Sequence, residues 1–178
     1  MSHSVGKILM LYSSVDGHTH AICLRLAEQL KANYAITLHS LDDAALPNPL
    51  QFDKIILGAS IRYGKHRPNV EQFIRQYKRL LNDKPSAFFS VNLVARKAEK
   101  NTPDSNPYLQ KLLTQCDWQP QLKGVFAGKV DYQKYRFFDR QMIRIIMWMT
   151  KGPTALDSSI DYTDWPSVDA FAQRIHQL

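Results

Sequence analysis

Cysteine is scarce in this sequence. Among 178 residues there are two cysteines, Cys23 and Cys116, and they belong neither to a C-x-x-C pair nor to any spacing typical of a metal site. A disulfide framework is therefore excluded, and two reduced thiols are expected. The N-terminal stretch has a short apolar run without a small-residue cleavage site, so we expect the chain to stay in the cytoplasm.

Two common nucleotide-binding motifs are also missing. The sequence contains neither G-x-x-x-x-G-K-[ST] nor G-x-G-x-x-G. His18 and His20 flank Thr19 but lack a third ligand, and no carboxylate cluster offers a Mg²⁺ site, so no metal is expected. No Ser-His-Asp, paired-carboxylate or Cys-His arrangement stands out. No catalytic residue is therefore assigned from the sequence.

Acidic residues are few in the middle of the chain. Residues 62–151 hold 18 of the 23 Lys and Arg residues but 7 of the 16 Asp and Glu residues, and the whole chain has a net charge of +7. This imbalance predicts an anionic partner, such as nucleic acid, an acidic lipid surface or a polycarboxylate substrate. A solvated basic face that keeps the protein soluble is the alternative.

Apolar runs alternate with helical patterns along the chain. The runs at 7–12, 34–39, 54–60, 86–92 and 123–128 predict strands, and helices are expected at 18–33, 68–82, 104–116, 138–150 and 165–178. Strands that are apolar throughout are covered on both faces, which favours a doubly wound α/β domain with a parallel sheet. Pro47 and Pro49 predict an irregular crossover between the second and third strands. One domain over residues 1–178 accounts for the whole pattern.

The segment Ser-Ser-Val-Asp-Gly-His-Thr, residues 13–19, joins the first strand to the first helix. Backbone N–H groups at a helix N-terminus favour an anion, and the hydroxyls of Ser14 and Thr19 can donate to it. We therefore expect the N–H groups of residues 15–19 to converge on one monoester phosphate. The loops after the first, third and fourth strands should meet at the carboxyl edge of the sheet, where ligands bind.

This loop resembles the S/T-x-T-G-x-T phosphate loop of the flavodoxin family. Ser14, Gly17 and Thr19 match it, while Asp16 stands where a hydroxyl residue is usual and is expected to point away and cap the helix. The segments GASIRYG (58–64), SVNLVARK (90–97), YRFFDR (135–140) and YTDW (162–165) resemble the menaquinone-dependent protoporphyrinogen oxidases, flavodoxin-fold enzymes of heme synthesis in gamma-proteobacteria. The similarity spans nearly the whole chain.

The resemblance implies a flavodoxin-like five-stranded parallel sheet in the order 2-1-3-4-5, with helices on both faces and a helical insertion at 129–152 after strand five. It implies FMN as cofactor, protoporphyrinogen IX as substrate, and menaquinone or ubiquinone as acceptor. Oxidation to protoporphyrin IX removes six electrons, in three two-electron cycles. It also implies peripheral attachment to the cytoplasmic face of the inner membrane.

The resemblance and the three loops together predict the site residues. The FMN-binding set is Ser14, Val15, Asp16, Gly17, His18, Thr19, Ser60, Ile61, Arg62, Tyr63, Gly64, Ser90, Val91, Asn92, Leu93 and Val94. The substrate carboxylates are expected to meet cations from two of these loops, because arginine grips carboxylates bidentately. That set is Arg62, Lys65, Arg67, Arg96 and Lys97, with Lys100 nearby.

Residues 137–152 predict an unusual helix. An apolar stripe is expected to dock on the domain or line the flavin cleft; it consists of Phe138, Met142, Ile145, Ile146 and Met149. The opposite side is expected to show Ile143, Met147 and Trp148 interleaved with Arg140 and Arg144. The run is too short to span a bilayer, so we predict an interfacial helix on anionic lipid. Core packing or a dimer contact is the alternative.

Three other functions remain open for this sequence. A flavodoxin-type electron carrier would usually be acidic, unlike this chain. An NAD(P)H-dependent quinone reductase on the same fold would turn over with NADPH. A nucleic-acid-binding module would use the basic block and show steep salt dependence, without a yellow colour; we expect no nucleic-acid partner.

Overall fold

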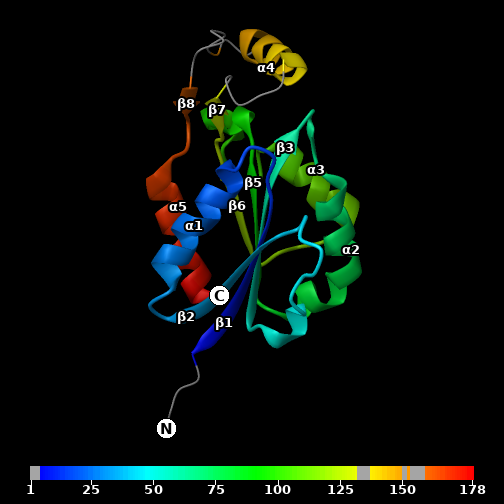
Figure 1. Ribbon diagram of the computed structural model, residues 1–178, viewed down its shortest axis with the longest axis vertical. Coiled ribbons are helices and arrows are strands. Elements are labelled where there is room, and N and C mark those ends of the chain that lie inside the picture. Colours follow the sequence, from blue (N-terminus) through cyan, green and yellow to red (C-terminus); the bar gives the residue numbers. More distant parts are fainter. Residues whose placement is uncertain (1–4, 132–136, 150–151, 153–158) are drawn as a thin grey trace.

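The computed structural model describes residues 5–131, 137–149, 152 and 159–178 (Figure 1). Its strands are β1 (Gly6–Ser13), β2 (Tyr34–Ser40), β3 (Lys54–Arg62), β4 (Lys65–His66), β5 (Ser86–Val91), β6 (Leu122–Phe126), β7 (Lys129–Asp131) and β8 (Ser159–Asp161). Its α-helices are α1 (His18–Leu30), α2 (Pro68–Asp83), α3 (Pro107–Cys116), α4 (Phe137–Met149) and α5 (Trp165–Gln177). Three short 3-10 helices lie at η1 (Pro49–Gln51), η2 (Leu93–Arg96) and η3 (Ala98–Lys100).

The main sheet has the strand order β2-β1-β3-β5-β6, and all four pairings are parallel. The two-residue β4 pairs antiparallel with the end of β3 and was not predicted. With β4 left aside, the expected order of strands one to five, 2-1-3-4-5, is confirmed. The first and third strands therefore lie side by side, and their carboxyl ends form the edge where ligands bind in such folds.

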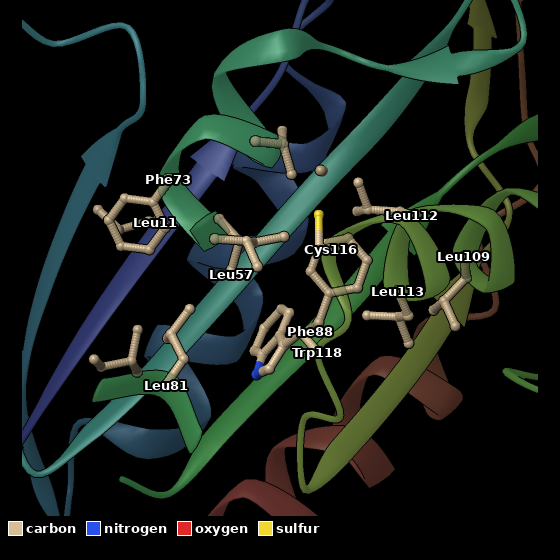
Figure 2. Packing of buried hydrophobic residues seen from close by; sticks show 14 of the residues in the cluster. Leu11, Leu57, Phe73, Leu81, Phe88, Leu109, Leu112, Leu113, Cys116 and Trp118 are labelled. Carbon is tan, nitrogen blue, oxygen red and sulfur yellow. The ribbon is translucent and has the colours of Figure 1, made fainter. Parts of the chain in front are cut away.

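Consecutive strand residues supply two separate cores. In β1, Leu9 and Leu11 pack in the cluster that includes α2 and α3, whereas Ile8 and Met10 pack in the cluster that includes α1 and α5. Figure 1 shows these helix pairs on opposite sides of the sheet. Figure 2 shows the first cluster, where Phe88 contacts Trp118 with ring centroids 5.9 Å apart. Burial on both faces explains why the strands are apolar throughout.

The helices begin and end close to the predicted residues, with local differences. Helix α2 has Pro68 in its first turn, as expected. Helix α3 begins at Pro107 and not at residue 104, because the Asn106 side chain accepts a hydrogen bond from the Leu109 N–H and caps the helix there. Between β2 and β3 the chain forms η1, with Pro49 at its start, so the irregular crossover is confirmed.

The segment after β6 differs from the expected helical insertion at 129–152. It begins with a strand, β7, which pairs antiparallel with β8 in a two-stranded ribbon separate from the main sheet. Helix α4 follows, and Figure 1 shows it at the top of the molecule, beyond β3, β7 and β8. A strand of three residues is too short to show an alternating pattern, so the sequence did not predict β7. Its partner, β8, lies about 30 residues further along the chain.

Helix α4 presents a different face to the domain from the one predicted. Met147 is fully buried against Val130, and Ile143 packs beside it, although both were expected on the outer side. Ile145, expected to dock, is 53% exposed. The expectation for this helix is therefore wrong in its orientation, because a helical wheel gives relative angles but not the position of the neighbouring strand. Met142 does line the cleft; the side chains of Phe138, Ile146 and Met149 lie outside the described part.

Candidate functional site

A cleft of about 960 Å³ of open space lies at the carboxyl edge of the sheet. The three predicted loops all line it, through Ser14, Val15, Asp16, His18, Thr19, Ser60, Ile61, Arg62, Tyr63, Gly64, Val91, Asn92, Leu93 and Val94. Tyr108, Gly128, Lys129, Met142 and Ile143 complete the lining. The fold thus brings together most of the expected cofactor residues at the position where doubly wound folds bind ligands.

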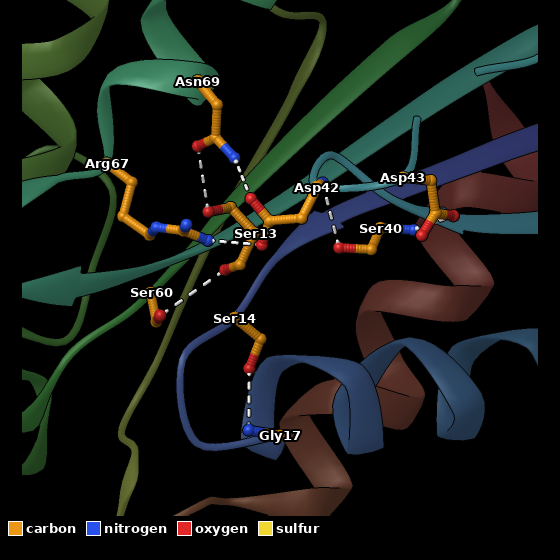
Figure 3. Close-up of polar contacts among 9 residues, drawn as sticks. All are labelled: Ser13, Ser14, Gly17, Ser40, Asp42, Asp43, Ser60, Arg67 and Asn69. Atoms are coloured by element: carbon orange, nitrogen blue, oxygen red, sulfur yellow. Dashed lines mark hydrogen bonds and ion pairs between the residues drawn. The ribbon is translucent and has the colours of Figure 1, made fainter. Parts of the chain in front are cut away.

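The loop between β1 and α1 forms one end of the cleft. Gly17 is the N-cap of α1 and adopts φ +85°, a left-handed conformation that favours glycine. Its N–H donates to Ser14 Oγ over 3.0 Å, as Figure 3 shows, and Gly17 does not line the cleft. The expectation that Asp16 caps α1 is wrong, because Gly17 occupies the cap position and the helix has no side-chain cap. The Gly17 N–H, which was expected to point to the phosphate with its neighbours, instead donates to Ser14 Oγ within the loop.

Thr19 gives the most direct sign that this end of the cleft holds an anion. The residue is 0% exposed, yet its Oγ1 has no hydrogen-bond partner, although it lines the cleft from the first turn of α1. An unsatisfied buried hydroxyl costs about 1–3 kcal/mol, so such a group calls for an explanation. A phosphate oxygen at the helix N-terminus would supply the missing acceptor. The residues present therefore fit the phosphate of a mononucleotide cofactor.

His18 connects the same loop to the segment before α5. Its Nε2 lies 2.6 Å from Thr163 Oγ1, and that hydroxyl donates to the Ala127 carbonyl over 2.9 Å. Because Thr163 gives its proton to Ala127, Nε2 of His18 must be the donor in the first bond. Burial lowers the pKa of His18 below its usual value, while Asp161, 3.7 Å away, opposes this shift. His18 therefore acts chiefly as a neutral hydrogen-bond donor that fixes the loop.

The turn between β3 and β4 forms the second wall. Tyr63 has φ +51° and Gly64 has φ +76°, the backbone of a two-residue type I′ hairpin turn. Positive φ is uncommon for an aromatic residue, and such strain is concentrated at functional sites. Tyr63 is 53% exposed, and the Arg62 guanidinium lies 5.3 Å from its ring centroid. The hairpin thus presents an aromatic ring and a cation at the cleft.

A buried amide network holds the third wall. Asn92 accepts a hydrogen bond from the Ala95 N–H at 3.2 Å, which fixes the start of η2. Its side chain and that of Asn106 exchange hydrogen bonds at 3.0 and 3.3 Å. Ser90 does not line the cleft, but its hydroxyl accepts from Asn92 Nδ2 and contacts His66 Nε2 behind the wall. This network fixes the start of η2, where Leu93 and Val94 line the cleft.

The predicted substrate cations do not gather in one place. Arg62 lines the cleft, whereas Lys65 lines a neighbouring cavity. Figure 3 shows that Arg67 instead donates to Asp42 over 2.6 Å, in a network with Asn69 and Ser13. Arg96 donates to the Leu93 carbonyl at 3.1 Å. The remaining two, Lys97 and Lys100, lie next to η2 and in η3 without lining either cavity.

Five lining residues were absent from the predicted cofactor set. Gly128 and Lys129 follow the end of β6, so the rule that ligands meet strand ends could have found them. Met142 was expected at the cleft as part of the apolar stripe, whereas Ile143 was placed on the wrong side. Tyr108 lies in the first turn of α3, away from any strand end, and no sequence signal marks it.

Across residues 5–131, 137–149, 152 and 159–178, no three His, Cys, Asp or Glu side chains are grouped closely enough to hold a metal ion. Over the same residues, no helix is both long enough and apolar enough to cross a membrane.

The chain matches a known protein family over most of its length. The model of the flavodoxin domain matches residues 9–157. Among solved structures, the two-electron reduced flavodoxin of Megasphaera elsdenii aligns with a TM-score of 0.52 and 15% identity, over 66% of this chain and 84% of that chain. The chain therefore belongs to the flavodoxin-domain family.

Two sequence relatives are more specific. A protein of Leishmania major named protoporphyrinogen IX dehydrogenase (quinone) is 44% identical over 174 residues, which cover 97% of this chain and 75% of that protein. The protein of the same name from Escherichia coli (strain K12) is 41% identical over 177 residues, which cover 97% and 96% respectively. The resemblance noted from the sequence is thereby confirmed at the level of the family.

Proposed function

We propose that this protein is an FMN-dependent protoporphyrinogen IX dehydrogenase that passes electrons to a quinone. The observation that carries the proposal is the unpartnered, fully buried Thr19 Oγ1 at the cleft end of α1. In addition, the chain is 41–44% identical over 97% of its length to relatives of that name. When bound, FMN supplies two-electron redox chemistry, so removing six electrons from a porphyrinogen takes three cycles.

The three walls of the cleft have separate roles in this proposal. Ser14, His18 and Thr19 would hold the phosphate at the N-terminus of α1. The backbone of residues 93 and 94, fixed by Asn92, would hold the polar edge of the flavin ring. Tyr63 would cover the ring from the β3–β4 turn, and the apolar side chains of Met142 and Ile143 from α4 would exclude water from the cleft.

The first experiment asks which cofactor the cleft takes. Apoprotein should turn yellow and quench flavin fluorescence on addition of FMN, while FAD should bind much more weakly, because the chain has one phosphate loop and no second nucleotide motif. Steady-state assays should then show porphyrinogen oxidation that depends on menaquinone or ubiquinone, and no turnover with NADPH. Turnover with NADPH would instead identify an NAD(P)H-dependent quinone reductase. Flavin reduction without porphyrinogen oxidation would identify an electron carrier.

We further propose that the protein attaches peripherally to the cytoplasmic face of the inner membrane through α4. Arg144, Ile145 and Trp148 are all exposed on this helix, and Trp148 is 74% exposed. A cation beside exposed tryptophan and isoleucine suits the surface of an anionic bilayer. Since Met147 is buried, it takes no part in this contact. A quinone acceptor dissolved in lipid would be within reach of a cleft that α4 borders.

Flotation with anionic liposomes tests this attachment. The native protein should float at low salt, and the variant Ile145→Glu/Trp148→Glu should remain in the soluble fraction with its FMN bound. The control Leu24→Glu/Leu50→Glu changes two other exposed apolar residues, 50% and 67% exposed, and should float like the native protein. Equal flotation of native protein and α4 variant would show that α4 is not the contact.

A further inference from the structure

A second cavity adjoins the cleft, and the proposed function above does not use it; counted together with the space open to solvent it measures about 510 Å³, against about 960 Å³ for the cleft. It lies between the β3–β4 turn, the start of α2 and one side of α3. Gly64 and Tyr108 line both cavities, so the two share a wall. A ligand that extends past Tyr108 would therefore contact both spaces.

The second cavity carries excess positive charge. Lys65 comes from β4 and Lys111 from α3, and both are exposed. Among the described residues, neither lysine has an ion-pair partner. One carboxylate, Glu71, also lines the cavity, but it is bound to Arg75 at 2.7 Å, and Arg75 donates in addition to the Gln115 carbonyl at 2.8 Å. The two ammonium groups are thus left to attract an external anion.

His66 adds a neutral donor to the buried side of this cavity. Ser90 Oγ accepts a hydrogen bond from Asn92 Nδ2 at 3.1 Å and lies 2.9 Å from His66 Nε2. Ser90 is fully buried, and among the described residues His66 Nε2 is the acceptor within reach of its hydroxyl proton, so we assign the hydroxyl as donor to Nε2 and the imidazole proton to Nδ1. No described residue pairs with Nδ1, and His66 is one of the residues that line the cavity. Burial keeps the ring neutral by lowering the pKa of His66 to about 4.

We infer that this second cavity is a carboxylate subsite, in which Lys65, Lys111 and His66 bind one propionate of the porphyrinogen while the macrocycle reaches the cleft past Tyr108. The inference rests on the proposed function for the identity of the ligand. It moves the recognition of substrate charge away from Arg67, which is paired with Asp42, to two lysines without partners. Lys111 and His66 thereby gain a binding role that no loop motif indicated.

The test compares a dicarboxylate with its neutral ester. Binding of protoporphyrin IX and of its dimethyl ester to the FMN-loaded protein is measured by fluorescence, and KM is measured with the corresponding porphyrinogens. The native protein should bind the dicarboxylate at least tenfold more tightly than the ester. The variant Lys65→Gln/Lys111→Gln should bind both equally, with at least a tenfold higher KM for the dicarboxylate.

A matched control removes the same charge elsewhere. In Lys31→Gln/Arg79→Gln the two altered residues are exposed and line neither cavity, so its preference for the dicarboxylate should equal that of the native protein. The single variants Lys65→Gln and Lys111→Gln should each lose part of the preference, which gives a readout if the double variant fails to fold.

The outcomes separate this inference from the proposed function. If the lysine variant keeps the native preference, or the native protein does not distinguish acid from ester, the subsite is wrong. If the native protein binds the dicarboxylate with the expected preference but oxidises no porphyrinogen, the subsite stands and the proposed function fails.

Discussion

The two cavities that meet at Gly64 and Tyr108 differ in chemistry. The cleft is lined mainly by hydroxyl, aromatic and apolar residues, with Asp16, His18, Arg62 and Lys129 among them, whereas the second cavity has two lysines without an ion-pair partner among the described residues, a buried histidine and one carboxylate that is already paired. A cofactor with an extended ring needs the first kind of surface, and a small anionic group needs the second. Under the proposed function, the redox centre and the recognition of substrate charge would lie in these two adjoining places.

His66 offers the largest expected effect and tests the buried side of the second cavity. Its pKa is about 4 when folded, against 6.5 in the unfolded chain, so the unfolded state binds more protons between these values. The free energy of unfolding is therefore highest above pH 6.5 and falls as the pH drops toward 4. At 1.36 kcal/mol per pKa unit, the loss is about 3 kcal/mol. Urea unfolding of native protein and His66→Gln from pH 7 to 4 measures this. If the free energies of unfolding of the native protein and of His66→Gln changed in parallel with pH, the lowered pKa of His66 would be contradicted.

Thr19 gives the next largest effect and tests the cleft. Thr19→Val keeps the shape of the side chain but removes the hydroxyl, which should weaken FMN binding by about 1.5–3 kcal/mol, or roughly 10- to 100-fold. The apoprotein should be no less stable, since the lost hydroxyl is unpartnered. Titration of apoprotein with FMN measures the change. Thr114→Val, at an exposed position on α3, is the control and should bind FMN normally.

Tyr63 lies in the turn that separates the cavities, and its change should have opposite effects on folding and binding. Tyr63→Asn relieves an unfavourable positive φ, because asparagine tolerates that region, and should raise the free energy of unfolding by about 1 kcal/mol. The same change removes the proposed ring contact and should weaken FMN binding. Thermal unfolding of apoprotein and an FMN titration give both numbers. A loss of stability would show that the tyrosine ring holds the turn.

Arg67 gives the smallest expected effect on KM, because it does not line the second cavity and is paired with Asp42. It forms a partly exposed ion pair with Asp42, of a kind that contributes about 0–1 kcal/mol. Arg67→Gln should therefore leave KM for porphyrinogen unchanged while lowering the free energy of unfolding slightly. Steady-state kinetics beside the Lys65→Gln/Lys111→Gln variant make the contrast. A large rise in KM for Arg67→Gln would restore it as a substrate anchor.

The sequence predicted the fold, most of the cleft and, of the two lysines in the second cavity, Lys65 but not Lys111. Strand order and the three loops follow from buried apolar runs and from the rule that strand ends meet, which are local and topological facts. Lys111 and Tyr108 lie on α3, where nothing in the residue pattern shows which cavity they face. Arg67 was predicted to bind substrate because it lies in a cation-rich loop; its partner, Asp42, is 25 residues away, and only the folded chain brings the two together.

Helix α4 shows a second limit of the same kind. Its amphipathic pattern predicted a helix but not its orientation, which depends on Val130 in the β7–β8 ribbon, where Met147 packs. Likewise, the loop motif predicted a phosphate site but not that Ser14 would use the Gly17 N–H internally. For α4 the deciding contact is a tertiary one, between Met147 and Val130. For the loop it is a hydrogen bond set by the local backbone conformation. The pattern of residue types encodes neither.

The most direct test of the account is anaerobic formation of protoporphyrin IX, followed by its fluorescence, with FMN-loaded protein, protoporphyrinogen IX and menaquinone. We predict that porphyrin forms only when the quinone is present and that three quinones are reduced per porphyrin. In the Thr19→Val variant, which should lose FMN, the rate of porphyrin formation should fall. Quinone-independent oxidation, or no oxidation by protein that holds FMN, would contradict the account.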